Sequence, residues 1–296
     1  MLENFHDHDV DLDGTRIHAA VGGSGPPVLL LHGYPETHAM WHLVAPALAE
    51  HHTVVAADLR GYGDSSRPPS RDDHSSYSKR AMAADQVGLM RELGFDTFAL
   101  VGHDRGARVS HRLCLDHPDV VSRVAFLDIV PTRHVFTHVD RSLAQAYYHW
   151  FFLAQAPDLP EHLIGADPDY YLRRKLAQWS GGEGIESFAP EAVDEYVRCF
   201  SDPESIRASC EDYRAGASID LGHDEVDASA GHKVDCPALV LWGREGYVGQ
   251  AYDPLTVWRD YATDVRGHAV VGGHFLPEEA PEETTTALLA FLNPGG

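Results

Sequence analysis

The most reactive pattern in the sequence is Gly102-His103-Asp104-Arg105-Gly106, which follows four apolar residues and precedes a helix-like stretch. This is the layout of a sharp turn from a strand into a helix, which lifts the central side chain out of a sheet. Glycines on both sides let the backbone turn tightly. The central residue is Asp104, and a carboxylate in that position attacks carbon directly and leaves an ester on the protein. The pattern therefore indicates displacement of a leaving group from an sp³ carbon.

An attacking carboxylate needs a base for the second half of the reaction, and the base needs an acid that orients it. The expected chain order is nucleophile, acid, histidine. His274 follows the last predicted strand, in a Gly-Gly-His-Phe loop, and is the candidate base. Two carboxylates compete for the acid: Asp128, beside a stiff turn that ends in proline, and Glu245, beside Arg244. We favour Asp128 because it is shorter, and the spacing alone leaves both open.

The elements that hold these side chains alternate between strand and helix. An antiparallel pair of edge strands is predicted within residues 10–21, around Asp13-Gly14. Further strands are predicted at 27–31, 53–57, 98–101, 121–127, 238–242 and 269–271, and helices at 40–49, 77–93, 105–117 and 281–292. This alternation is typical of an α/β fold, a mostly parallel sheet with helices on both faces. Functional groups collect at the carboxyl ends of such strands, where His32, Asp104 and Asp128 lie.

A mostly helical stretch interrupts this alternation. It contains aromatic clusters, including the run from Tyr147 to Phe152. We divide the chain into a first part of an α/β core at residues 1–130, a helical lid or cap at 131–230, and a second part of the core at 231–296. A lid would cover the active edge of the sheet. The alternative is a helical subdomain packed elsewhere, with its aromatic side chains forming an ordinary core.

Composition excludes several classes of partner. The chain has 296 residues, of which 44% are hydrophobic, and a net charge of −22. Such a charge repels nucleic acid and anionic membranes. The sequence contains no apolar stretch long enough for a membrane span and no secretory signal at its N-terminus. Its four cysteines show no C-x-x-C spacing, which favours reduced thiols in a cytoplasmic protein.

Twenty histidines raise the question of a metal site. The densest spots are His6-Asp7-His8 and His51-His52, and neither has a third ligand at helical spacing. The sequence has neither a G-x-G-x-x-G fingerprint after a strand nor a Walker motif. We therefore expect no metal and no cofactor.

Several longer motifs give the chain a family resemblance. Across nearly its whole length it resembles the fluoroacetate (haloacetate) dehalogenases of the α/β-hydrolase superfamily. The matching segments are His32-Gly33-Tyr34-Pro35, residues 102–108, residues 127–131, Tyr148-His149-Trp150, residues 210–216 and residues 273–279. The Asp-Arg-Gly-Ala-Arg run at 104–108, together with His149, Trp150 and Tyr213, is specific to that family. The shorter pieces are shared with epoxide hydrolases and haloalkane dehalogenases. Tyr34 departs from the family, which often has phenylalanine there.

The resemblance implies a role for each candidate residue. It implies Asp104 as nucleophile, His274 as base and Asp128 as acid, in agreement with the reading of the residues themselves. It also implies that Arg105 and Arg108 hold a substrate carboxylate, that His149, Trp150 and Tyr213 hold the departing halide, and that the chain forms a homodimer. The implied substrate is a 2-halocarboxylate such as a haloacetate, which reacts with water to give glycolate and halide. Backbone N–H groups of Tyr34 and Arg105 would form the oxyanion hole.

Elementary chemistry agrees with the two binding roles. Arg108 lies one helical turn beyond Arg105, and two guanidinium forks can grip a carboxylate through paired hydrogen bonds. Halide departure needs hydrogen-bond donors, which an imidazole, an indole and a phenol supply. The alternative reading makes either arginine a structural ion-pair partner and Trp150 plain core.

Two rival functions use the same residues differently. An epoxide hydrolase would keep Asp104, His274 and Asp128, and would protonate the epoxide oxygen with Tyr148 and Tyr213. Paired arginines argue against it, because epoxides carry no carboxylate. A non-catalytic small-molecule receptor of the same fold is the other rival, and the intact triad argues against it. The sequence leaves open whether C–F bonds are cleaved or only C–Cl and C–Br bonds.

Overall fold

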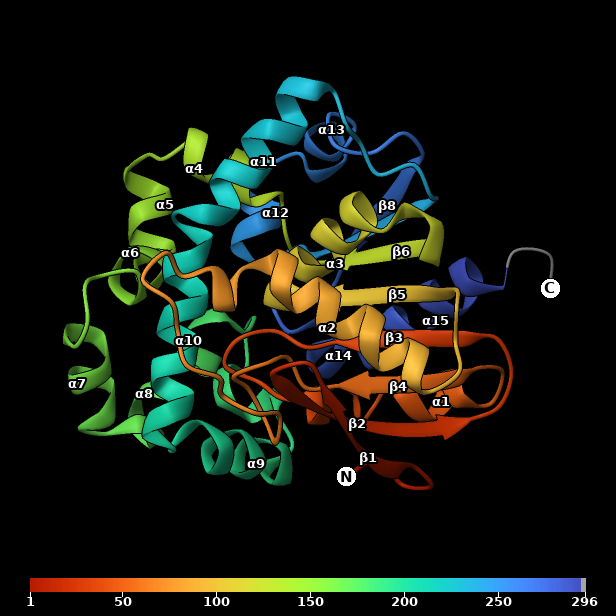
Figure 1. Ribbon diagram of the computed structural model, residues 1–296, viewed down its shortest axis with the longest axis horizontal. Coiled ribbons are helices and arrows are strands. Elements are labelled where there is room, and N and C mark those ends of the chain that lie inside the picture. The colour runs from red at the N-terminus through yellow and green to blue at the C-terminus, as the bar shows by residue number, and fades with distance from the viewer. Residues whose placement is uncertain (294–296) are drawn as a thin grey trace.

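The computed structural model describes residues 1–293, and its framework is an eight-stranded sheet in the order β1-β2-β4-β3-β5-β6-β7-β8 (Figure 1). The pairs β1–β2 and β2–β4 are antiparallel, and the remaining neighbours are parallel. This confirms the predicted α/β fold with a mostly parallel sheet. The strands are β1 (His6–Leu12), β2 (Thr15–Gly23), β3 (Pro27–Leu31), β4 (Thr53–Ala57), β5 (Phe98–His103), β6 (Val121–Leu127), β7 (Ala238–Gly243) and β8 (Val265–Val270).

Helices cover both faces of the sheet. In Figure 1, α2 and α3 lie in front of the strands and α15 lies behind them. Because both faces are covered, the central strands read as continuous apolar runs, and every residue of β5 is buried. The helices of this core are α1 (Ala45–Ala49), α2 (Lys79–Glu92), α3 (Asp104–Asp116), α12 (Tyr247–Ala251), α13 (Pro254–Trp258), α14 (Leu276–Glu279) and α15 (Pro281–Leu292). Short 3₁₀ turns are η1 (His38–Trp41), η2 (Ser75–Tyr77), η3 (Pro118–Val120) and η4 (Gly184–Ser187).

A helical insertion separates β6 from β7. Its helices, mostly green in Figure 1, gather at one end of the sheet, beside the start of α3. They are α4 (Thr132–Thr137), α5 (Arg141–Ala146), α6 (Tyr148–Leu153), α7 (Leu159–Gly165), α8 (Pro168–Trp179), α9 (Pro190–Phe200), α10 (Pro203–Gly216) and α11 (Ile219–Ala230). The insertion therefore covers the edge of the sheet where the parallel strands have their carboxyl ends.

Two predicted elements differ from the structure. The helix predicted over 40–49 is instead η1 (His38–Trp41) followed by the short α1 (Ala45–Ala49). Pro46 explains the break, since a proline inside a helix removes a backbone donor and clashes with the preceding turn. The strand predicted over 269–271 is β8 (Val265–Val270). It is an edge strand, so its first half carries polar, partly exposed residues that an apolar pattern does not reveal.

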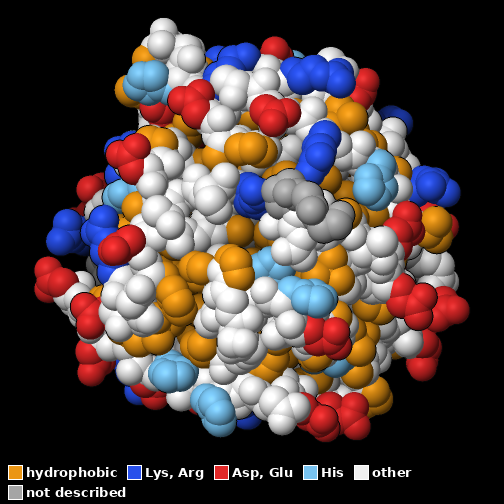
Figure 2. Space-filling view, turned by 90° about the vertical axis from the view of Figure 1, so that its right-hand side faces the viewer, with side chains coloured by type: hydrophobic (Ala, Val, Ile, Leu, Met, Phe, Trp, Pro, Cys, Tyr) orange, Lys and Arg blue, Asp and Glu red, His pale blue; other side chains and the backbone are white. Residues whose placement is uncertain are grey.

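The surface of the molecule is rich in acidic groups. On the side away from the insertion, Asp and Glu side chains are spread around the rim of the face (Figure 2). Within residues 1–293, no helix has the length and apolar character needed to cross a membrane.

Candidate active site

The turn around Asp104 joins β5 to α3. Asp104 itself has a positive φ of 42°, a strained value for a residue with a side chain. The two flanking glycines permit close packing: a Cβ at Gly106 would collide with the Leu31 carbonyl, and one at Gly102 with the Ser110 hydroxyl. Strain of this kind persists where the surrounding structure holds it, commonly at functional sites. The predicted strand–turn–helix layout is present.

His274 and Asp128 form a hydrogen-bonded pair. The Nδ1 atom of His274 lies 2.6 Å from Oδ2 of Asp128, and the Gly243 N–H donates to the other oxygen at 2.9 Å. The backbone of His274 is fixed from the insertion, since its N–H donates to the Trp179 carbonyl at 3.0 Å. Glu245, the competing carboxylate, lines the same cavity but makes no hydrogen bond to His274 within residues 1–293. The geometry therefore pairs the histidine with Asp128.

Asp104 and His274 carry opposite charges at neutral pH. Burial would raise the pKa of Asp104, but His274, Arg108 and Arg105 lower it below its ordinary value. Burial would lower the pKa of His274, but the hydrogen bond and charge of Asp128, with the charge of Asp104, raise it to about 9. At neutral pH the site therefore holds an ionised carboxylate beside a protonated imidazole.

A backbone donor already faces the nucleophile. The Tyr34 N–H donates to Oδ2 of Asp104 at 3.1 Å. The Arg105 N–H belongs to the first turn of α3, where backbone donors lack a partner within the helix. These are the two groups that the sequence predicts for an oxyanion hole.

The two arginines are buried beside Asp104 but are held differently. Arg105 donates from Nε and Nη2 to the Asp212 carboxylate at 2.9 and 2.7 Å, so one side of its guanidinium is in a structural ion pair. Arg108 donates from Nη1 to the Val130 carbonyl and to Thr132, at 3.0 and 3.1 Å. Its Nε atom is buried without a partner among the described residues. Each guanidinium group therefore uses some of its N–H donors within the protein and keeps others that could bind a substrate.

The three candidate halide donors meet in the insertion. The ring of His149 lies 5.6 Å from that of Tyr213, and the ring of Trp150 lies 6.3 Å from Tyr213. The Tyr213 hydroxyl and the His149 Nδ1 atom are buried without partners in the described chain. Burial and Lys175 lower the pKa of His149, and burial and Asp104 raise the pKa of Tyr213. Both groups therefore remain neutral and each can donate one hydrogen.

Trp150 also links these donors to the arginines. The guanidinium of Arg108 lies 4.4 Å from the centre of the Trp150 ring, and that of Arg105 lies 4.2 Å from the centre of the Tyr213 ring. Such contacts between cations and ring faces are attractive and fix the orientation of the planar groups.

A cavity of about 200 Å³ lies between the core and the insertion, and both line it. The core lines it with Asp104, Asp128 and His274, and the insertion lines it with His149 and Trp150. Sequence reasoning did not assign four further lining residues, Tyr147, Gln178, Trp179 and Tyr247. Trp179 has a buried indole N–H without a partner in the described chain, and its ring lies 4.3 Å from His149. Its position at the end of α8 carries no sequence signal, because only folding brings α8 to the cavity.

A second buried pair, His103 and Glu36, lies next to the backbone of His274. The Nε2 atom of His103 is 2.8 Å from the His274 carbonyl, an acceptor, so Nε2 carries the proton. The Nδ1 atom of His103 then faces Glu36 at 3.2 Å. Burial raises the pKa of Glu36 to about 8, which suits a protonated carboxyl in this contact. Sequence reasoning also missed Glu36, although it directly follows the His-Gly-Tyr-Pro motif.

The comparisons with known proteins agree with this geometry. Residues 26–281 match the model of a family described as having the alpha/beta hydrolase fold. The chain belongs to the α/β-hydrolase family. Over 293 residues the hydrolase is 48% identical to a fluoroacetate dehalogenase from Burkholderia sp, an alignment covering 99% of this chain and 95% of the relative. This identity confirms the family resemblance read from the sequence.

Two further relatives show how broad the family is. The hydrolase is 37% identical to a soluble epoxide hydrolase from Corynebacterium sp. (strain C12), and 97% of each chain is covered. It also matches the crystal structure of a candidate alpha/beta hydrolase from Nostoc sp PCC 7120, with 56% sequence identity and a TM-score of 0.97. That match covers 99% of this chain and 100% of the Nostoc chain. These relatives indicate a hydrolase with a small-molecule substrate, and the substrate itself has to be argued from the site.

Proposed function

We propose that the protein is a hydrolytic dehalogenase that converts haloacetates to glycolate and halide through an ester on Asp104. One observation carries this proposal: Asp104, whose pKa is lowered by the two buried guanidinium groups of Arg105 and Arg108, lines the same cavity as the His274–Asp128 pair. The arginines themselves lie just behind the lining of that cavity, so they act on the substrate carboxylate from its wall. A neutral substrate gains nothing from two cations at the point of attack, whereas a 2-halocarboxylate needs them to approach an anion. The relative named a fluoroacetate dehalogenase supports the same substrate class.

The first half of the reaction is a displacement. An oxygen of Asp104 attacks the α-carbon, a C–O bond forms, and the carbon–halogen bond breaks with its electron pair leaving on the halide. Arg105 and Arg108 hold the substrate carboxylate, while His149, Trp150 and Tyr213 donate to the departing halide. Donors that act as charge develops on the leaving group lower the barrier of the step.

The second half is hydrolysis of the ester. His274 removes a proton from water, and the resulting hydroxide adds to the carbonyl carbon of the Asp104 ester. Asp128 holds the imidazole and stabilises its protonated form. The N–H groups of Tyr34 and Arg105 stabilise the oxyanion. Its collapse breaks the bond between the carbonyl carbon and the glycolate oxygen, and His274 returns its proton to that departing oxygen. The Asp104 carboxyl group then releases its remaining proton to solvent and is again a carboxylate.

Epoxide hydrolysis is the second candidate, and one observation favours it. Of the two tyrosines predicted for this role, Tyr148 is exposed, but the hydroxyl of Tyr213 is buried without a partner among residues 1–293. A phenol that donates to an epoxide oxygen would assist ring opening. The relative named a soluble epoxide hydrolase supports this alternative. Both candidates share Asp104, His274 and Asp128, so only the substrate separates them.

The test traps the covalent intermediate. His274→Asn keeps the cavity but removes the base, so the ester on Asp104 should form and persist. We expect intact-protein mass spectrometry, followed by peptide mapping, to show an adduct on Asp104 after incubation with fluoro-, chloro- or bromoacetate. The matched control is the double variant Asp104→Ala/His274→Asn, which should remain unmodified.

Two outcomes would overturn parts of this proposal. An adduct formed only with epoxides would replace dehalogenation by the second candidate. Full turnover of haloacetate by His274→Asn, with no adduct, would remove His274 as the base. Halide release measured across the three haloacetates then shows which carbon–halogen bonds the wild-type protein breaks.

A further inference from the structure

A groove of about 620 Å³ lies away from the catalytic cavity, where β1 and β2 meet η1 and α9. Two histidines from different elements line it, His18 on β2 and His38 at the start of η1. Their ring centres are 5.2 Å apart. With Asp58, they offer atoms suited to a metal that all lie within 4.8 Å of one another. The mechanism proposed above uses none of these residues.

Each of the two imidazoles is oriented by its own carboxylate. The Nδ1 atom of His38 lies 2.9 Å from Oδ1 of Asp58, and the Nδ1 atom of His18 lies 3.1 Å from Oδ1 of Asp9. A carboxylate only accepts hydrogen bonds, so both Nδ1 atoms carry the proton, and in the neutral imidazole each Nε2 atom presents a lone pair. Burial would lower the pKa of His38, but Asp58 raises it, so a metal ion would compete with a proton at its Nε2 atom. A metal-binding histidine usually has this arrangement, with its other ring nitrogen donating to a carboxylate or carbonyl.

Asp58 orients His38 through a hydrogen bond and is not itself proposed as a metal ligand. Its Oδ1 atom also accepts the backbone N–H of His38 at 2.7 Å, and its Oδ2 atom accepts that of Asp64 at 2.9 Å. Both oxygens are therefore committed to protein donors. Asp58 is fully buried, which fixes the His38 ring more firmly than a surface carboxylate could.

Negative charge dominates the groove. An oxygen of Asp7 lies 3.9 Å from Nε2 of His18, on the same face of β1 as Asp9. Glu191, Asp194 and Glu195 of α9 also line the groove. Arg198 lines it too, but its charge is matched by Asp64 and Glu195, at 2.8 and 2.6 Å. A cation entering the groove therefore meets a net negative field.

We propose that this groove binds one divalent transition-metal ion of the Zn²⁺ type. The ligands would be Nε2 of His18 and Nε2 of His38. The exposed Asp7 carboxylate, 3.9 Å from Nε2 of His18, would move onto the ion as the third ligand, with water completing the coordination. Two imidazoles bound at about 2.0–2.1 Å to a tetrahedral ion have ring centres about 5 Å apart, close to the separation in this structure. Imidazole and carboxylate ligands suit Zn²⁺ and Ni²⁺ and are poorly matched to Mg²⁺.

A bound metal ion would stabilise the edge of the sheet formed by β1 and β2. It would link β1 and β2 to η1, so that separation of the outer strand pair would require loss of the metal. Binding to the folded state alone raises stability in proportion to the logarithm of the metal concentration. The expected consequence is a melting temperature that rises with Zn²⁺ and does not change with Mg²⁺.

The experiment titrates chelator-treated full-length protein with Zn²⁺ by calorimetry, with Mg²⁺ as the comparison ion. We expect one site, and a dissociation constant at least about tenfold weaker in His18→Gln and in Asp7→Asn. Asp7 is an exposed side chain, so Asp7→Asn keeps the fold and decides the matter if His18→Gln does not fold. The visible spectrum of bound Co²⁺ reports independently on nitrogen and oxygen ligands.

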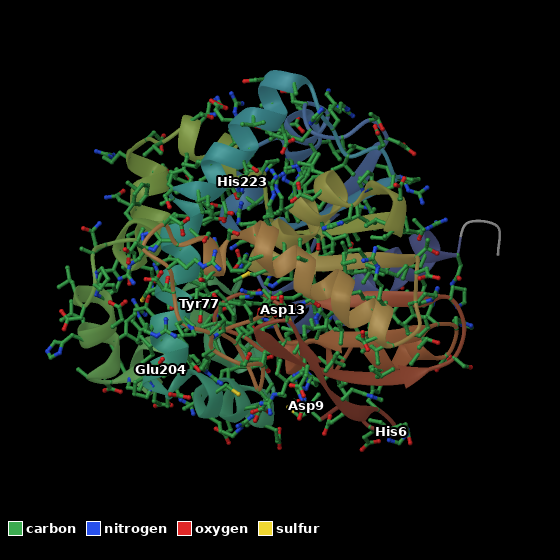
Figure 3. The ribbon with its side chains drawn as sticks, in the orientation of Figure 1. His6, Asp9, Asp13, Tyr77, Glu204 and His223 are labelled. Atoms are coloured by element: carbon green, nitrogen blue, oxygen red, sulfur yellow. The ribbon has the colours of Figure 1, made fainter. Side chains whose placement is uncertain are left out.

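Two matched controls remove histidines elsewhere. His6→Gln/His8→Gln changes the opposite face of strand β1 from Asp7 and Asp9; His6 and Asp9 are labelled in Figure 3. His134→Gln/His138→Gln removes a stacked pair at the C-terminal end of α4, whose ring centres are 4.2 Å apart. Both double variants should bind Zn²⁺ as the wild type does. Unchanged affinity in Asp7→Asn, no Zn²⁺ binding by the wild type, or loss of the site in either control would overturn the proposal.

Discussion

Asp104 and His274 show how strongly one side chain sets the properties of its neighbour. The Asp104 carboxylate helps to raise the pKa of His274 to about 9, and His274 in turn helps to lower that of Asp104. In the resting protein this mutual effect keeps the nucleophile ionised, as displacement requires. Hydrolysis requires the opposite state of the histidine, because only a neutral imidazole can accept a proton from water.

The ester itself resolves this conflict and gives a pH prediction. Esterification removes the charge of Asp104, so the pKa of His274 in the intermediate should fall below 9. The neutral form increases as pH rises, so the rate of ester hydrolysis should rise with pH and level off below about pH 9. Rapid-quench single-turnover experiments measure that rate. A rate that falls over the same interval would contradict the assignment of His274 as base.

Tyr213 gives a prediction about the leaving group. Fluoride concentrates its charge on a small atom, so it gains more from a hydrogen bond than bromide does. Tyr213→Phe removes one hydroxyl that is buried without a partner in the described chain, and keeps the ring. Loss of a preorganised donor costs about 10²–10³ in kcat. We expect a larger loss for fluoroacetate than for bromoacetate, measured by halide release under saturating substrate.

The control for Tyr213 is another tyrosine of the insertion. Tyr170→Phe removes a hydroxyl from an exposed side chain and should leave both rates unchanged. If wild type releases no fluoride, the comparison is made between chloroacetate and bromoacetate, with a smaller difference. Equal losses for every halide would mean that Tyr213 shapes the cavity without solvating the leaving group.

At the scale of elements, one carboxylate ties the insertion to the core. Asp212 on α10 accepts from Arg105 on α3, from Lys79 on α2 and from the Tyr62 hydroxyl. All four side chains are buried. Burial would raise the pKa of Asp212, but Arg105 and Lys79 hold it far below its ordinary value. The guanidinium beside the nucleophile is thus oriented by a helix more than a hundred residues away in sequence.

Removal of that charge should destabilise the fold. Asp212→Asn leaves the buried Arg105 without its counter-charge and leaves Lys79 with Asp220 alone, 3.9 Å away. Breaking a buried ion pair typically costs about 3–5 kcal/mol. Urea unfolding followed by circular dichroism measures the change in free energy of unfolding. Asp169→Asn, at an exposed pair with Arg173 on α8, is the matched control and should change it little. Similar small effects in both variants would show that the Asp212 network is not a stabilising link.

At the scale of the whole molecule, the insertion and the end of the sheet together form a small cavity. The cavity of about 200 Å³ takes lining residues from both parts of the chain. With a net charge of −22, the protein repels an anionic substrate at long range. Binding of a small acid therefore depends on the cations beside Asp104.

Cavity size gives the last prediction. The rate constant kcat/KM should fall from bromoacetate to 2-bromo acids with longer alkyl chains, because a cavity of about 200 Å³ must hold the whole acid. Bromoacetamide, similar in size but uncharged, should also react poorly because it does not use the arginines. Steady-state bromide release across this series measures both effects. A flat profile with chain length would mean that the cap opens widely during turnover.

Local sequence determined the parts of this protein that depend on short-range chemistry. The strand–turn–helix around Asp104, the apolar central strands and the loop of His274 follow from glycine freedom, apolar runs and chain order. The α/β fold and the family could be predicted from them. Pro46 was also visible in the sequence, and its consequence for the helix at 40–49 was simply missed.

Only the tertiary structure decided which distant groups meet. It paired His274 with Asp128 in place of Glu245, committed one side of Arg105 to Asp212, and brought Trp179 to the cavity. It also brought His18 and His38 to the groove that Asp7 lines, whereas the sequence drew attention to the histidines beside Asp7 and to His51-His52. The physical reason is that sheet register and helix packing fix distances between residues far apart in the chain, and no local pattern encodes those distances.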